Sequence, residues 1–119
     1  MDIKEIAEKL TAYCREGKFE DAQKELFAED AVSIEPQASE VFAKETKGLQ
    51  AIIEKGKKFE SMAEAYHSLE VSDSIIANQS FAISMRLDMT MKGQGRMDMK
   101  ELCLYKVKDG KVVSEEFFV

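Results

Sequence analysis

The feature that most constrains this chain is a run near its middle in which every second residue is apolar. The positions are Phe81, Ile83, Met85, Leu87, Met89 and Met91. Successive side chains of a β-strand point to opposite faces, so this period of two predicts one long strand over residues 81–91. Residues 97–108 and 111–119 predict two further strands. Asp109-Gly110 between them supplies the positive φ angles that a tight hairpin turn needs.

The first half of the chain has the period of helices instead. Apolar residues recur at helical spacing over residues 3–14 and 19–27, which Gly17 separates, and again over residues 49–62. Thr46 is the expected N-cap of the third helix. Residues 31–35 predict a short strand that Pro36 ends, residues 37–47 a loop, and residues 66–76 a further strand.

Helices followed by a series of strands indicate an α+β fold, with three N-terminal helices packed in an antiparallel sheet. The length of 119 residues is typical of one domain with one hydrophobic core. We therefore expect a single domain over residues 1–119.

Composition and charge argue against several classes of partner. The net charge is −6 and no basic stripe is present, which argues against nucleic acid as a partner. No segment approaches the roughly 18–20 apolar residues that cross a bilayer, and the N-terminus lacks the apolar centre of a signal peptide. Cys14 and Cys103 are too few and too distant for a disulfide framework or a Cys-x-x-Cys metal site. We expect a reduced, cytoplasmic protein without a bound metal.

Three segments resemble the SnoaL-like branch of the nuclear transport factor 2-like superfamily. They are Leu-Phe-Ala-Glu-Asp-Ala-Val at 26–32, Lys-Gly-Leu at 47–49 and the hairpin at 105–113. The resemblance covers essentially the whole chain. It implies a cone-shaped α+β domain in which a strongly curved sheet wraps around the helices and leaves a deep pocket. The superfamily contains isomerases, cyclases, hydrolases, dehydratases and non-catalytic binding modules, so the resemblance implies no single activity.

Arg86-Leu87-Asp88 resembles the Arg-x-Asp element of the limonene epoxide hydrolases in that superfamily. There the pair faces the pocket, the Asp donates a proton to the epoxide oxygen and the Arg holds the carboxyl groups. The resemblance implies that Arg86 and Asp88 are catalytic. The alternation by itself favours the opposite orientation, because the polar side of such a strand normally faces solvent. Both orientations stay open.

The inward orientation of Arg86 has a consequence for assembly. It would place the apolar row of residues 81–91, extended by Leu102 and Leu104, on the outer face of the sheet. An apolar face of that size does not remain exposed on a monomer. We would then expect a homodimer through the outer sheet face, an arrangement common in the superfamily, with adaptable methionine side chains at the interface.

The same resemblance assigns further pocket residues. Ser33 and Glu35 align with polar positions that help to hold the attacking water in the hydrolases. Their general-base Asp aligns with Phe117, so hydrolysis by that mechanism would need a substitute. Glu115, two residues earlier on the same face, is the better placed substitute, and Glu35 is the other.

Glu101, Tyr105 and His67 complete the candidate site. Glu101 lies in an apolar row and is expected in the pocket or at its rim. Tyr105 is expected as a pocket wall with an available hydroxyl or as a core tyrosine bonded to a carboxylate. His67 is the only histidine, and no Gly-x-Ser-x-Gly motif accompanies it. We interpret His67 as a pocket histidine able to act as acid or base, with a metal site as the alternative.

Two functional hypotheses follow. The first is an enzyme without a cofactor that acts on a small organic molecule as an isomerase, cyclase, hydrolase or lyase, with Asp88 or Glu115 as acid or base. The second is a non-catalytic domain that binds a small ligand or simply dimerises. An enzyme requires a buried carboxyl group with a perturbed pKa beside an accessible cavity. If the methionine row packs on the helices, the Arg86–Asp88 site is lost and a plain binding or structural domain becomes the better description.

Overall fold

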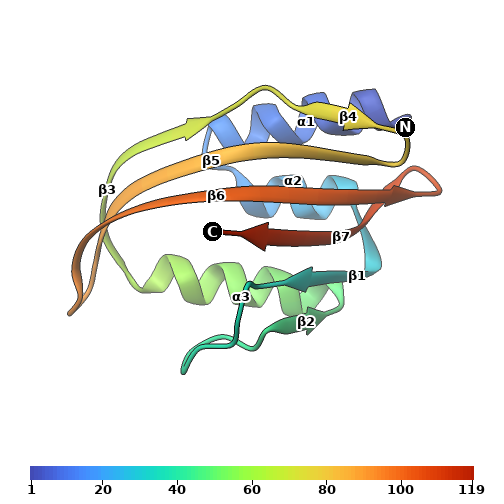
Figure 1. Cartoon of the computed structure of the whole chain (residues 1–119). Helices are drawn as coiled ribbons and strands as arrows, with labels where there is room; N and C mark the ends of the chain where they lie inside the picture. The colour runs from blue at the N-terminus through green and yellow to red at the C-terminus, as the bar shows by residue number, and fades with distance from the viewer.

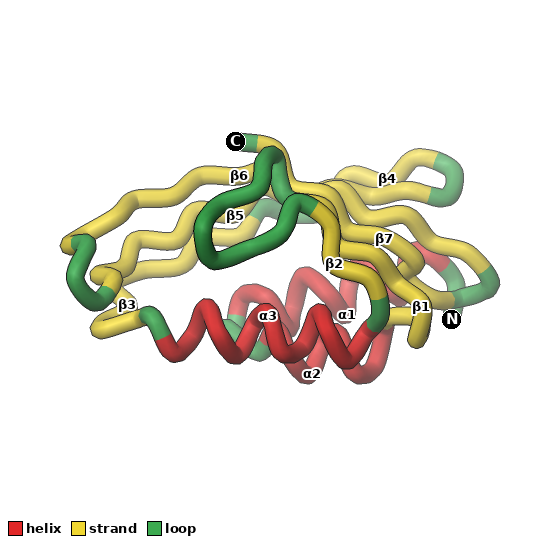
Figure 2. Tube along the Cα trace, turned by 90° about the horizontal axis from the view of Figure 1, so that it is seen from below, coloured by secondary structure: helices red, strands yellow, loops and turns green.

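The computed structural model describes all 119 residues. Three helices cover one face of a curved sheet of seven strands, as Figures 1 and 2 show. The elements in chain order are α1 (Ile3–Arg15), α2 (Phe19–Leu26), β1 (Phe27–Ile34), β2 (Glu45–Lys47), α3 (Leu49–Ser61), β3 (Ala63–Val71), β4 (Ile75–Ala77), β5 (Ser80–Met91), β6 (Gly95–Lys108) and β7 (Lys111–Phe118). The α+β expectation and the three helices are confirmed.

The sheet has the strand order β2-β1-β7-β6-β5-β3, with β4 also paired to β5. Its hairpins are antiparallel as expected, but β1 and β7 run parallel, so the sheet is mixed. No hairpin sets the relative direction of β1 and β7, because α3 and five strands intervene in the chain. The long strands β5 and β6 arch over the helices, and the sheet does not close into a barrel (Figure 1).

The start of α3 differs from the sequence prediction. Thr46 lies in β2, and the residue before the helix is Gly48, whose φ of 97° favours glycine. The Gly48 N–H donates to the carbonyl oxygen of Ala31 at 2.8 Å, which ties the start of α3 to β1. Backbone geometry therefore begins this helix, and no side chain caps it.

The methionine row faces the helices. Ile83 and Met89 are at most 1% exposed, and Phe81, Met85 and Met91 are buried with them. Of the two orientations left open by the sequence, the one that places this row on the outer face is wrong. The β5–β6 hairpin explains why: Met91 pairs with Gly95, so odd-numbered residues of β5 lie opposite odd-numbered residues of β6. Any orientation that brings Glu101 inside therefore brings its partner Met85 inside and leaves Arg86 outside.

The core lies between the sheet and the three helices. Ile6 and Leu10 of α1 and Leu26 of α2 are at most 1% exposed and pack against the inner side of the sheet. Asp2 caps α1 through its Oδ1 atom, which accepts from the Glu5 N–H at 2.9 Å. None of the helices is long and apolar enough to cross a membrane.

Candidate functional site

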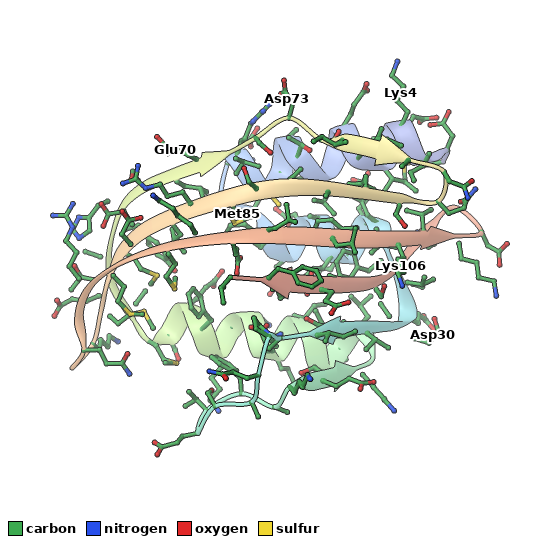
Figure 3. The ribbon with its side chains drawn as sticks, in the orientation of Figure 1. Lys4, Asp30, Glu70, Asp73, Met85 and Lys106 are labelled. Carbon is green, nitrogen blue, oxygen red and sulfur yellow. The ribbon has the colours of Figure 1, made fainter.

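A cavity of about 290 Å³ lies between the inner face of the sheet and the helices. Its walls come from all three helices, from strands β1, β3, β5, β6 and β7, and from the segment that follows β1. Most of the lining side chains are apolar, including Met85 of β5, which Figure 3 labels. The aromatic members are Phe19, Phe27, Phe42, Phe59, Tyr66, Tyr105 and Phe117. A cavity of this size and character suits a small, largely apolar molecule.

Polar side chains meet at one part of this wall and form a continuous hydrogen-bonded chain. The Lys55 ammonium group of α3 donates to Glu35 Oε2 at 2.6 Å and to Ser33 Oγ at 2.9 Å. The Ser33 hydroxyl in turn donates to Glu115 Oε2 at 2.7 Å. The chain thus links the end of β1, the middle of α3 and β7. Four side chains with matched donors and acceptors hold one another in fixed positions.

Glu115 is almost completely buried, with 6% of its surface exposed. Burial raises the pKa of its carboxyl group, while the Ser33 hydrogen bond and the Lys55 charge act in the opposite direction. The net result is a raised pKa. Glu115 lines the cavity, so its carboxyl group retains a proton to a higher pH there than it would in water.

Glu101 has the clearest perturbation among the carboxyl groups of the cavity. Loss of solvent, followed by the negative charges of Glu35 and Glu115, raises the pKa of Glu101 to about 7. Its hydrogen-bond partner is the Cys103 thiol, whose Sγ lies 3.8 Å from Glu101 Oε1 and is only a weak donor. A carboxyl group that changes protonation near neutral pH can both accept and donate a proton.

Tyr105 and Phe117 form part of the cavity wall. The Tyr105 ring stacks on Phe81 at a centroid distance of 5.0 Å and meets Phe27 edge-on at 6.5 Å. Burial raises the pKa of Tyr105 well above its ordinary value, so this hydroxyl stays protonated. The Phe117 ring lies 5.5 Å from Lys55 Nζ, which adds a cation–π contact to the polar chain.

Arg86 and Asp88 lie on the outer face of the sheet, away from the cavity. Arg86 makes a two-pronged ion pair with Asp98 at 2.9 and 2.7 Å, and Arg96 makes an equivalent pair with Asp88 at 3.0 and 2.9 Å. Arg86 also approaches Glu70, which extends away from the ribbon in Figure 3. The expectation that these two residues face the pocket is therefore wrong. The β5–β6 pairing places even-numbered residues outside.

His67 is also outside the cavity. It is exposed, and its Nε2 lies 2.7 Å from Thr90 Oγ1 on the outer face. The β3–β5 pairing is irregular between Tyr66 and Ser68, so His67 falls in the irregularity while Tyr66 remains on the cavity side. The expected pocket histidine is thus absent from the cavity. No group of three His, Cys, Asp or Glu side chains is placed to hold a metal ion.

The sequence interpretation missed Lys55, which is the centre of the polar chain. A signal was present: Ile52 and Phe59 flank Lys55 at spacings of three and four residues, so the three share one helix face. A lysine on the apolar face of a helix ordinarily extends its charge to solvent, which is why the pattern was not informative by itself. Here only 16% of the Lys55 side chain is exposed, because Glu35 and Ser33 are in reach.

The comparisons with known proteins agree with this architecture. A family model described as a SnoaL-like domain matches residues 1–119. Among solved structures, a candidate SnoaL-like polyketide cyclase from Mesorhizobium loti is 29% identical with a TM-score of 0.93, and the match covers 100% of both chains. No protein of curated function matches the chain.

Two more distant structures share the fold alone. A Xanthomonas campestris protein of unknown function with a cystatin-like fold is 16% identical, has a TM-score of 0.82, and is matched over 99% of this chain and 90% of that one. A Catenulispora acidiphila protein with a ketosteroid isomerase-like fold, solved with trimethylamine, is 17% identical. Its TM-score is 0.73, and the match covers 97% of this chain and 85% of that one.

Proposed function

Because the chain belongs to the SnoaL-like domain family, we propose that it is a cofactor-independent enzyme that moves a proton on a small, largely apolar organic molecule. The reaction would be of the isomerase or cyclase type, at a carbon next to a carbonyl group. Glu101 would act as the acid and base. Glu115 would be a second carboxyl group in contact with the substrate, within walls that exclude water.

Glu101 is the observation that carries this proposal. A base is most effective when its pKa is close to the working pH, and the Glu101 pKa of about 7 meets that condition. The residue lines the cavity next to Met85 and Met99, which a substrate could contact directly. Isomerases and cyclases use such a carboxylate to remove a proton from carbon and return it.

Hydrolysis of an epoxide is the less supported reaction. The Arg86–Asp88 pair that would protonate the epoxide oxygen is outside the cavity, and Phe117 stands where the hydrolases have their base. Ser33 and Glu35, which were expected to hold water, are instead bonded to Lys55.

The alternative is a binding module without catalysis, the description preferred from the sequence if the methionine row packs on the helices, as it does. The raised pKa of Glu101 beside the cavity is what favours an enzyme over it. The binding module is favoured by the closed set of polar contacts: no buried side-chain nitrogen or oxygen atom lacks a partner. An apolar cavity with satisfied polar groups is sufficient for binding. A related fold solved with trimethylamine offers a small amine as one ligand to test. A sheet-to-sheet homodimer also stays a proposal. The apolar side chains on the outer face include Leu102, Leu104 and Phe118, and also Ile75, which pairs with the outward-facing Ala82.

Exchange of carbon-bound hydrogen tests the enzyme proposal directly. The protein in D₂O is incubated with a panel of small cyclic ketones, 1,3-diketones and hydroxyaromatic ketones, and loss of the proton signal next to the carbonyl is followed by NMR. We expect exchange with at least one compound and a loss of about 100-fold or more in Glu101→Gln. Glu116→Gln, on the other face of β7, is the matched control and should exchange at the unmutated rate.

The same samples separate the two functions. Ligand-induced shifts of cavity resonances without any exchange, for every compound, would assign the chain to the binding class. Exchange that survives Glu101→Gln unchanged would remove Glu101 from the mechanism.

A further inference from the structure

The cavity presents an unequal set of charges to a substrate. Glu35, Glu101 and Glu115 line it, and ionised carboxylates can only accept hydrogen bonds. When a proton leaves carbon next to a carbonyl group, negative charge develops on the carbonyl oxygen. That oxygen needs a donor, preferably a positively charged one.

Two lysines line the cavity, and only one is buried. Lys57 is 61% exposed and lies 3.7 Å from Glu20, so it belongs to the rim. Lys55 is 16% exposed. Its ammonium group has three N–H bonds, and two are used by Glu35 and Ser33. The third has no protein acceptor among the hydrogen bonds of the structure.

Lys55 is suited to donate to a developing oxyanion because its ammonium group is held in a fixed position. Glu35 and Ser33 hold the nitrogen from one side, and the Phe117 ring lies 5.5 Å from it on the cavity wall. Ser33 is completely buried and is itself held by Glu115. A donor that is already oriented does not have to reorganise when charge develops, which is the basis of oxyanion stabilisation.

We propose that Lys55 is a catalytic residue whose free N–H donates to the carbonyl oxygen of the substrate as that oxygen becomes negative, with Glu35 and Ser33 as its positioning residues. The inference rests on the proposed function. In the step, the Glu101 carboxylate takes the proton, and the electrons of the broken C–H bond form a carbon–carbon double bond. The carbonyl π pair moves to oxygen beside Lys55. Return of the proton to carbon regenerates the Glu101 carboxylate and the carbonyl group.

The test uses 4-substituted phenols of graded acidity, whose oxygen resembles the developing enolate, together with the exchange assay. For the unmutated protein we expect phenol affinity to increase with phenol acidity. In Lys55→Met this dependence should be lost, and the exchange rate should fall about 100-fold, as for removal of one oxyanion donor. Lys55→Arg should recover part of both. Lys106→Met, which removes an exposed lysine from the outer face of β6, is the matched control and should change neither.

Several outcomes would overturn the role of Lys55. One is an unchanged acidity dependence of phenol binding in Lys55→Met, and another is exchange at the unmutated rate. Should Lys55→Met fail to fold, judged by its amide NMR spectrum, Lys55→Gln and Lys55→Arg carry the same comparison. Loss of exchange in Glu101→Gln with full exchange in folded Lys55 variants would leave the proposed function standing and remove this inference. If the unmutated protein shows neither exchange nor acidity-dependent phenol binding, both proposals are wrong.

Discussion

The Lys55 ammonium and the Glu35 carboxylate lie 2.6 Å apart at the cavity wall, with 16% and 25% of their side chains exposed. An ion pair that is this shielded differs from the other pairs of the molecule, in which at least one partner is more than 40% exposed or the distance is longer.

Removal of Lys55 should therefore destabilise the fold. Lys55→Met leaves Glu35 without a counter-ion and Ser33 without a donor, and we expect a loss of about 2 kcal/mol in the free energy of unfolding. Lys57→Met removes an exposed lysine from the same helix and should change stability by no more than about 0.5 kcal/mol. Urea denaturation monitored by circular dichroism measures both. Equal effects of the two substitutions would show that the Lys55–Glu35 pair contributes no more than a surface contact.

Glu101 should make stability depend on pH. Its pKa is about 7 in the folded protein, against the ordinary glutamate value of 4.5 that applies in the unfolded chain. Between these values the folded chain retains a proton that the unfolded chain has released, so stability decreases as pH rises from about 4.5 to 7. The Glu101→Gln variant lacks this pH dependence. Relative to the unmutated protein, its free energy of unfolding should therefore increase by at most about 3 kcal/mol as pH rises through that window. Denaturation at pH 4.5 and pH 8 measures the difference. A constant difference between the two proteins would mean that the Glu101 pKa is not raised.

Met89 provides a test of which face of β5 is buried. It is 0% exposed, so Met89→Ala should cost about 2–5 kcal/mol. Ser84, on the same strand and exposed, is the control, and Ser84→Ala should stay within about 0.5 kcal/mol. A small loss at Met89 would contradict the packing of the methionine row on the helices.

The strand content and the order of elements were predictable because their patterns are local. The period-two row of residues 81–91 and the Asp109-Gly110 turn are each read from one continuous segment. The structure has β5 at the first and the β6–β7 hairpin at the second. Which face of each strand is buried was harder to predict. Glu101 and Arg86 cannot both face the cavity, because Met91 pairs with Gly95 and this register places Glu101 opposite Met85. The sequence does not mark which residues a three-residue turn contains.

The predicted site residues fall into those that line the cavity and those that lie outside it. Glu35, Glu101, Tyr105, Glu115 and Phe117 were assigned from their alternation and from family resemblance, and all five line the cavity. Arg86, Asp88 and His67 lie outside it, the first two because of strand register and the third because of a pairing irregularity. Lys55 could not be assigned from helix periodicity alone. Its inward position depends on Glu35 and Ser33, which are distant in sequence.

The outer ion pairs should be dispensable. The Arg86 and Asp98 side chains are 42% and 43% exposed, and pairs of this kind contribute about 0–1 kcal/mol. Arg86→Met should therefore change the free energy of unfolding by no more than about 1 kcal/mol and leave the exchange rate and phenol binding unaltered. The measurement is urea denaturation at low and high salt, followed by the exchange assay. A large loss of activity with unchanged stability would restore Arg86 to the site.

Phe118 and Leu102 are paired across β6 and β7 on the outer face, and both are more than 40% exposed. If the homodimer forms there, Phe118→Asp should place a charge in the interface and convert a dimer to a monomer, because an unpaired buried carboxylate is strongly unfavourable. Val41 is 41% exposed but lies in the segment between β1 and β2, where its carbonyl oxygen accepts from Lys58 of α3, so Val41→Asp should leave the dimer intact. Sedimentation velocity at several concentrations distinguishes the species. A monomeric unmutated protein would exclude the dimer, and a dimer that survives Phe118→Asp would place the interface elsewhere on the surface.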